Sequence, residues 1–201
     1  MNSQLIDSLR LRLGNNGLPY EIPMHPKLVH LTLGLFIVAI LFDIAGSIFP
    51  IERPIFKFLG LTALPSGFFD VGWYNLLGAS VVTFSTVAFG FFELILANPP
   101  INQNTDWGLN VSWTMLLHAL GGVLLLGVIV AMTLWRGLQR YHWRKHESRQ
   151  VQWGYLLLGL AMFGILFVHG TLGGQLGSQF GIHVTAAKLV QQGVNPNLLL
   201  K

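Results

Sequence analysis

Four apolar stretches, each longer than twenty residues, constrain the fold of this chain more than any other feature. They are almost free of charge and comprise residues 27–49, 73–96, 113–135 and 153–176. A helix of about 20 residues crosses a hydrocarbon core of about 30 Å, so each stretch can span a membrane. Charged residues make up only 10% of the chain, against about 25% in ordinary soluble domains. We therefore expect an all-α integral membrane protein, an antiparallel four-transmembrane-helix bundle.

The sequence divides into three segments around these stretches. Residues 1–26 form an N-terminal interfacial segment, in which leucines at spacings of four predict a short helix on the membrane surface from Ser3 to Leu13. Residues 27–176 form the four-helix transmembrane domain, and residues 177–201 form a polar C-terminal tail.

Prolines suggest the bounds of the first span. It is expected to follow Pro26 and to stop at Pro50, because proline suits a first helical turn and disrupts a helix interior. The connection from Pro54 to Gly72 is rich in Phe and Leu but interrupted by glycine and proline. We expect it to dip into the membrane interface without crossing.

A basic connection between the third and fourth spans indicates the orientation. It contains Arg136, Arg140, Arg144, Lys145 and Arg149. The positive-inside rule favours a cytoplasmic position for this connection, with both termini on the periplasmic or lumenal face of a bacterial inner or thylakoid membrane. Because the positive charge lies in one connection, binding of nucleic acid is not expected. The absence of cysteine excludes iron-sulfur clusters, thioether-linked haem and thiolate nucleophiles.

Three histidines lie within the spans and share one half of the membrane. His30 lies near the start of the first span, His118 near the start of the third and His169 near the end of the fourth. Since odd and even spans run in opposite directions, all three belong to the half that contains the termini. At 1.5 Å rise per residue, His118 and His169 are each roughly 7 to 9 Å from the midplane. His25 lies just ahead of the first span, on the same face.

A b-type haem requires two histidines at the same depth in the membrane, because two neutral imidazoles on different helices must face each other across the macrocycle. His118 and His169 are the favoured axial ligands of haem b. His25 and His30 are candidates for a second haem, a different axial pairing or a copper site near Met24. The alternative is that these histidines only form interhelical hydrogen bonds. The glycines beside these histidines either leave room for a porphyrin or allow the helices to pack closely.

Two carboxylates lie within the spans, and both are expected toward the basic connections. Asp43 and Glu93 are predicted to form ion pairs with Arg53, Arg136 or Arg140. Proton delivery to a reducible ligand such as a quinone is the second interpretation of these acids. Paired acids, a nucleophile-base dyad and a glycine-rich phosphate loop are all missing from the sequence, so a stand-alone enzyme is not expected.

Several motifs resemble the bacterial membrane-protein family named domain of unknown function 2231 (DUF2231). The resemblance covers roughly residues 22–184 and starts with the motif Met24-His25-Pro26-Lys27-Leu28-Val29-His30. It continues with Gly90-Phe91-Phe92-Glu93, with His118 and with Leu172-Gly173-Gly174-Gln175-Leu176. Similar proteins occur as membrane neighbours of Rieske or oxidase components, which implies a role in electron transport.

The predicted function is therefore that of a b-type cytochrome-like membrane subunit, which carries electrons within a respiratory or photosynthetic assembly. Its expected partners are membrane lipid, other subunits of an electron-transport complex and a quinone. Two alternatives remain: a cofactor-free accessory or structural subunit, and a protein with a histidine-based copper site.

Overall fold

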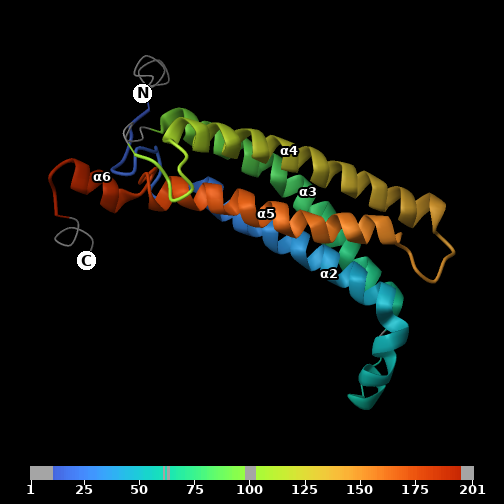
Figure 1. Ribbon diagram of the computed structural model, residues 1–201. Helices are drawn as coiled ribbons and strands as arrows, with labels where there is room; N and C mark the ends of the chain where they lie inside the picture. Colours follow the sequence, from blue (N-terminus) through green and yellow to red (C-terminus); the bar gives the residue numbers. More distant parts are fainter. Residues whose placement is uncertain (1–10, 61, 63, 98–102, 196–201) are drawn as a thin grey trace. The chain divides into compact units, whose positions relative to one another are not determined.

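The computed structural model describes residues 11–60, 62, 64–97 and 103–195, and this part of the chain is helical without any β-strand. The elements are α2 (Met24–Phe58), α3 (Pro65–Leu96), α4 (Val111–Leu138), the π-helix η1 (Gln139–Trp143), α5 (Trp153–Ser178) and the short α6 (Thr185–Gln191), as Figure 1 shows. Four of these segments are long and apolar enough to cross a membrane, with α4 and η1 counted as one. The four expected spans are thus confirmed.

The first span does not stop at Pro50, and this prediction was wrong. Helix α2 continues through Pro50 and Pro54 to Phe58, and its ribbon bends where the colour becomes cyan in Figure 1. Proline removes one backbone hydrogen bond and crowds the preceding turn, which kinks a helix when packing holds both sides of the bend. Here Phe56 lies beyond the first proline and packs on Phe49 before it, with ring centroids 6.0 Å apart.

The connection predicted from Pro54 to Gly72 is mostly helical as well. Pro65 was expected to interrupt this segment, but it is the first residue of α3. Its fixed φ angle and missing N–H are compatible with a helix start. Gly60 ends the preceding turn with a φ of 68°, in the left-handed region that glycine adopts readily.

The N-terminal segment is described only in part. Residues 3–10 of the expected Ser3 to Leu13 helix lie outside the described residues, and residues 11–13 are not helical. The chain then turns around Asn16, whose side-chain amide donates to the carbonyl oxygens of Tyr20 and Glu21 at 2.8 and 2.9 Å. This turn brings the chain to the first residue of α2.

The chain forms two compact units. Unit 1 consists of Met1–Lys27, Thr86–Val123 and Val168–Lys201, and unit 2 consists of Leu28–Ser85 and Leu124–Phe167. Unit 1 therefore contains the starts of α2 and α4 and the ends of α3 and α5. Unit 2 contains the remaining parts of the same four helices.

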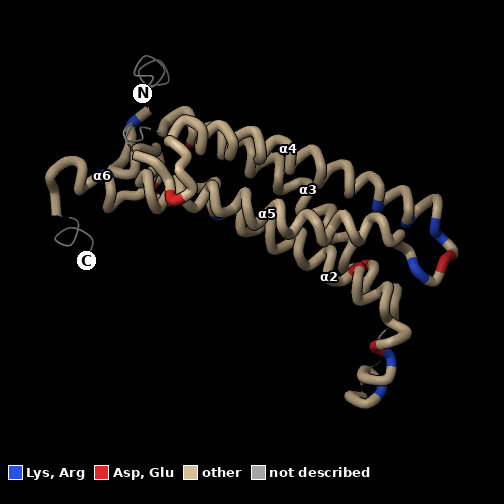
Figure 2. Tube along the Cα trace, viewed as in Figure 1, with Lys and Arg blue, Asp and Glu red and all other residues tan. Residues whose placement is uncertain are grey.

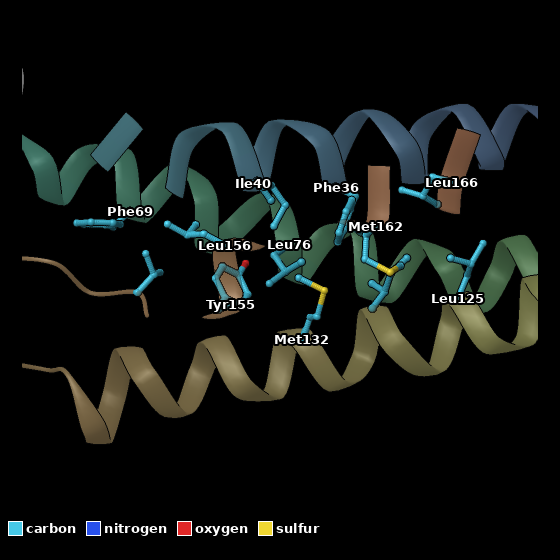
Figure 3. Packing of buried hydrophobic residues seen from close by; sticks show 14 residues of the cluster. Phe36, Ile40, Phe69, Leu76, Leu125, Met132, Tyr155, Leu156, Met162 and Leu166 are labelled. Atoms are coloured by element: carbon cyan, nitrogen blue, oxygen red, sulfur yellow. The ribbon is translucent and has the colours of Figure 1, made fainter. Parts of the chain in front are cut away.

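All four long helices contribute to the core of unit 2. Figure 3 shows Phe36 and Ile40 of α2 beside Leu76 of α3, Met132 of α4 and Leu156 of α5. Lipid tails are as apolar as these side chains, so close packing is the main source of cohesion.

A buried ion pair also lies in unit 2, and it confirms that Asp43 pairs with an arginine. Arg136 donates from Nε and Nη2 to the two carboxylate oxygens of Asp43 at 2.9 and 3.0 Å, and both side chains are fully buried. One turn later, Arg140 pairs with the half-exposed Asp70 of α3. Figure 2 shows that most charged residues of unit 2 lie near helix ends and in the connection before α5. The two-point geometry of the buried pair offsets part of the cost of burying charge.

Candidate functional site

Three histidines from three helices meet in unit 1. His25 lies in the first turn of α2, His118 on α4 and His169 on α5. The rings of His118 and His169 stack almost in parallel, with centroids 4.3 Å apart and an interplanar angle of 10°. The His25 ring stands edge-on to His118, at 5.7 Å and 83°. We refer to His25, His118 and His169 as the histidine cluster.

The hydrogen bonds of His25 fix its protonation pattern. Its Nδ1 lies 2.9 Å from the carbonyl oxygen of Thr86. A carbonyl oxygen only accepts, so Nδ1 carries the proton and donates it. In the neutral tautomer the other nitrogen, Nε2, carries a lone pair, and it lies 3.4 Å from Nε2 of His118. Metal-ligating histidines commonly have this arrangement, with one ring nitrogen bound to a backbone carbonyl and the other free for the metal.

One ring nitrogen of His118 lacks a hydrogen-bond partner among the described residues. This nitrogen, Nδ1, is buried. Since His25 Nε2 carries a lone pair, the proton of His118 belongs on Nε2, where it donates to His25. A ligand that binds between these two nitrogens would replace that hydrogen bond, and the proton could then move to Nδ1.

Each ring of the cluster lies against a glycine of another helix, in the pairs His25 with Gly90, His118 with Gly173, and His169 with Gly121. A Cβ atom at these glycines would lie 2.8, 2.7 and 2.6 Å, respectively, from the nearest ring atom. Real Cβ contacts essentially never fall below 3.0 Å. The absence of a side chain at these three positions is therefore what allows the rings to approach the neighbouring helices.

Glu93 holds the start of α2 beside the cluster. Its Oε1 accepts hydrogen bonds from the backbone N–H groups of Met24 and His25 at 2.7 and 3.0 Å, and from the Tyr20 hydroxyl at 2.9 Å. The first N–H groups of a helix lack intrahelical partners, and a carboxylate there also interacts favourably with the helix dipole. Burial, together with the hydrogen bond to Glu93, raises the pKa of Tyr20.

The predicted position of Glu93 toward the basic connections was wrong. It belongs to unit 1 and contacts Tyr20 and the backbone of α2, where an arginine partner was expected. The physical reason is direction: α3 returns toward the side from which α2 starts, so a residue near its end lies with the starts of α2 and α4.

His183 links the N-terminal turn to the end of α3. Its Nδ1 lies 3.1 Å from the carbonyl oxygen of Asn16, and its Nε2 lies 2.8 Å from that of Glu93. A neutral imidazole donates from one nitrogen only, so the tautomer decides which of these two carbonyl oxygens accepts a hydrogen bond from the ring. The residue has a φ of 58°, which is uncommon for a side chain larger than glycine.

The remaining histidines lie elsewhere. His30 belongs to unit 2 and its side chain is exposed. The proposed roles of His30 in a second haem or a copper site stay predictions. His142 and His146 are exposed in and after η1, as expected for residues of the basic connection.

The ring nitrogens of the histidine cluster are potential ligands of a metal ion or a haem iron. Among the described residues, no group of three or more His, Asp or Glu side chains is arranged to hold a metal ion. Imidazole nitrogens bind metals at about 2.0 Å, so two nitrogens on opposite sides of one ion lie roughly 4 Å apart. The facing nitrogens of His25 and His118 are 3.4 Å apart, so these two rings would have to separate slightly to hold one ion between them. His118 and His169 are stacked face to face, with ring centroids 4.3 Å apart, so these two rings too would have to separate to hold a haem iron between them.

The three histidines were found from the sequence, and Gly90 and Glu93 were also singled out, although not as supports of His25. Thr86 and Tyr20 were missed. Thr86, Tyr20 and Glu93 contact His25 or its helical turn, and Gly90 accommodates its ring. The direction of the second span could have revealed the position of the α3 residues, because the span places the segment from Thr86 to Glu93 on the same side as His25.

A family model matches most of the chain. The model of a family described as "Predicted membrane protein (DUF2231)" matches residues 21–186. The matched range contains the histidine cluster, its three glycines, Glu93 and His183. No curated protein and no solved structure matches the chain.

Proposed function

The chain belongs to the DUF2231 family of predicted membrane proteins, and we propose that it is a b-type cytochrome-like subunit that carries electrons within a respiratory or photosynthetic assembly. The observation that supports this proposal best is the pair of Nε2 atoms of His25 and His118, which face each other at 3.4 Å. We assign these two residues as the axial ligands of one haem b. The pair predicted from the sequence, His118 with His169, is the competing assignment.

Haem suits this donor set better than a bare copper ion. A bare ion needs several protein ligands, and the described residues do not provide a group of three or more. A haem iron takes its equatorial nitrogens from the porphyrin and needs only two axial ligands from the protein. The lone pair on His25 Nε2, fixed by the bond from Nδ1 to Thr86, provides one of them.

The chain's own residues have separate tasks in this proposal. A bound haem supplies reversible one-electron chemistry. His25 and His118 would hold the iron, and His169 keeps the His118 ring in place by stacking on it. Glu93 holds the helical turn that carries His25.

The position of the cluster suggests where electrons enter or leave. The protein is a multi-pass membrane protein, and the cluster lies near the starts of α2 and α4 and toward the end of α5. With the basic connection in the cytoplasm, the even number of spans places the starts of the first and third spans at the periplasmic or lumenal face of a bacterial inner or thylakoid membrane. Electron donors on that face, other subunits of the assembly and a membrane quinone are the proposed partners.

A cofactor-free accessory subunit is the second candidate, and one observation favours it. The three rings fill the space over their glycines and contact one another, so the cluster is closely packed in the absence of any ligand. In that case the histidines serve as interhelical contacts, each worth about 0.6 kcal/mol in lipid.

The visible spectrum of the purified full chain separates these functions. We expect a Soret band and an alpha band that sharpen on reduction with dithionite. His25→Ala and His118→Ala should change the spin state or remove the haem, whereas His169→Ala should retain two axial ligands. His142→Ala and His146→Ala are matched controls in the basic connection.

Each contrary result has a defined meaning. A folded but colourless protein would refute the cytochrome proposal and favour the accessory subunit, and metal analysis of the same sample would detect copper. A low-spin spectrum that survives His25→Ala but not His169→Ala would refute our axial assignment and favour His118 with His169.

A further inference from the structure

The end of helix α2 extends beyond what a membrane span needs. The helix has 35 residues, which corresponds to about 52 Å at 1.5 Å per residue. A hydrocarbon core is about 30 Å thick. The excess lies largely after Pro50, where the helix bends (Figure 1). We refer to residues 51–59, the part that follows the bend, as the α2 extension.

The α2 extension is amphipathic. Its largest apolar side chains are strongly exposed, with Ile51 at 76%, Ile55 at 60% and Phe58 at 88%. Their spacings of four and three residues place them on one helix face. Arg53 and Lys57 are also exposed, and a spacing of four residues places them on one face. Each follows Ile51 or Ile55 by two residues, about 200° around the helix, so this basic face is opposite the apolar face.

The extension is held in place by aromatic packing within unit 2. Phe56 packs on Phe49 and on Phe68 of α3, with ring centroids 6.0 and 5.6 Å apart. Phe49 and Phe68 also contact each other at 5.8 Å. The side of the extension toward α3 is therefore packed, and the exposed apolar face is a property of an ordered element.

The extension carries two basic residues and one acidic residue, Glu52. Neither Arg53 nor Lys57 forms an ion pair with a described carboxylate, whereas Arg136, Arg140 and Arg144 each do. An apolar face opposite a basic face is typical of helices that lie in the membrane interface. Anionic lipid headgroups attract such basic residues.

We propose that the α2 extension is an anchor that lies in the headgroup region and binds anionic lipid. Ile51, Ile55 and Phe58 enter the edge of the acyl chains, and Arg53 and Lys57 contact lipid phosphates. The bend at the prolines allows α2 to change direction from the span to the surface. This proposal does not depend on the histidine cluster.

The cysteine-free sequence allows a direct test. Single variants Ile51→Cys, Ile55→Cys, Phe58→Cys, Arg53→Cys and Lys57→Cys of the full chain carry a nitroxide label in lipid nanodiscs. Oxygen concentrates in the acyl region, and a neutral nickel chelate concentrates in water. We expect the oxygen-to-nickel accessibility ratio to be several-fold higher at the three apolar positions than at the two basic positions.

Lipid charge provides the second part of the test. We expect the labels at Ile51→Cys and Phe58→Cys to lie deeper in nanodiscs that contain phosphatidylglycerol than in phosphatidylcholine alone. The double change Arg53→Gln with Lys57→Gln should abolish this difference. Lys27→Gln with Lys145→Gln removes the same charge from other exposed positions and should preserve it.

Two results would overturn the proposal. High nickel accessibility at all five positions would place the extension in water. Low accessibility to both reagents at Ile51, Ile55 and Phe58 would show that a protein surface covers the apolar face, either a partner subunit or a second copy of this chain.

Discussion

The backbone N–H of His25 donates a hydrogen bond to the Glu93 carboxylate at 3.0 Å, so a residue near the end of α3 holds the first turn of α2. The same oxygen accepts from the N–H of Met24 at 2.7 Å. The His25 ring, in turn, is bound to the carbonyl oxygen of Thr86, two turns earlier on α3. The position of the proposed axial ligand therefore depends on α3 through both its backbone and its ring.

Replacement of Glu93 by alanine should destabilise the start of α2. Two helix N–H groups would lose their acceptor, and unsatisfied buried donors cost about 1–3 kcal/mol. Thermal unfolding in detergent should show this loss, and the haem spectrum should change because His25 is displaced. Glu93→Gln keeps an acceptor oxygen and should have a smaller effect on both measurements. Glu147→Gln, at an exposed carboxylate, is the control. An unchanged spectrum in a destabilised Glu93→Ala protein would contradict a role in positioning His25.

The two adjacent glycine pairs near the cluster should respond unequally to alanine. A Cβ at Gly121 or Gly173 would lie within 2.7 Å of a histidine ring, whereas one at Gly122 would be 3.9 Å from His169 and one at Gly174 would have nothing within 4 Å. Overpacking costs about 1–3 kcal/mol, while alanine in an open helix position gains about 0.5–1 kcal/mol over glycine.

Unfolding of the four variants in detergent tests this expectation directly. Gly121→Ala and Gly173→Ala should lose stability, and Gly122→Ala and Gly174→Ala should keep it or gain. Equal effects within each pair would mean that the glycines serve helix packing in general and have no specific contact with the rings.

The sequence predicted the spans well because apolar length alone determines whether a helix can cross a membrane. The length of an apolar stretch does not show where its helix begins or ends. Pro50 was expected to stop the first span, but Phe56 packs on Phe49 and carries α2 past the proline. Phe49 and Phe56 also pack on Phe68 of α3, a tertiary contact that is not encoded in the local sequence around the proline.

The histidines were found because ionisable residues are rare in spans and their depth can be counted. The depth of a residue in the membrane does not determine how its helix is rotated about its own axis. The nitrogen of His118 that faces His25 therefore could not be predicted. Glu93 was misplaced although direction along the chain placed it beside His25. The turn that brings Tyr20 to this carboxylate depends on side-chain hydrogen bonds of Asn16, which carry no periodic signal.

Tyr20 should make stability depend on alkaline pH. Burial and the hydrogen bond to Glu93 raise its pKa above the ordinary value of 10.0, so the folded protein favours the protonated hydroxyl. Its stabilising contribution is therefore complete below pH 10 and is lost as pH rises through the folded-state pKa. Tyr20→Phe should be less stable than the parent by about 1 kcal/mol at neutral pH, and the two proteins should converge in strongly alkaline solution.

Unfolding measured at several pH values checks this sign. Tyr74→Phe removes an exposed hydroxyl away from Glu93 and is the matched control. A gap between Tyr20→Phe and the parent that widens with rising pH would contradict the hydrogen bond to Glu93.

The ion pair of Asp43 and Arg136 should be the most sensitive polar contact in unit 2. Both side chains are fully buried, so removal of one partner leaves the other charge uncompensated, at a cost of about 3–5 kcal/mol. Asp43→Ala and Arg136→Ala should each approach this loss in detergent unfolding. The double variant Asp43→Leu with Arg136→Met replaces both charges by apolar side chains and should be clearly more stable than either single variant.

The second arginine of α4 gives a matched comparison. Arg140 pairs with Asp70, which is 48% exposed, and exposed pairs contribute about 0–1 kcal/mol. Asp70→Ala should therefore cost much less than Asp43→Ala in the same assay. If the two losses were equal, burial would not be the source of the effect. If the double variant at Asp43 and Arg136 were no more stable than the single variants, mutual neutralisation would not be the main role of the pair. The two charged side chains would then stabilise the fold through other contacts, such as the hydrogen bond from Arg136 to the carbonyl oxygen of Phe69.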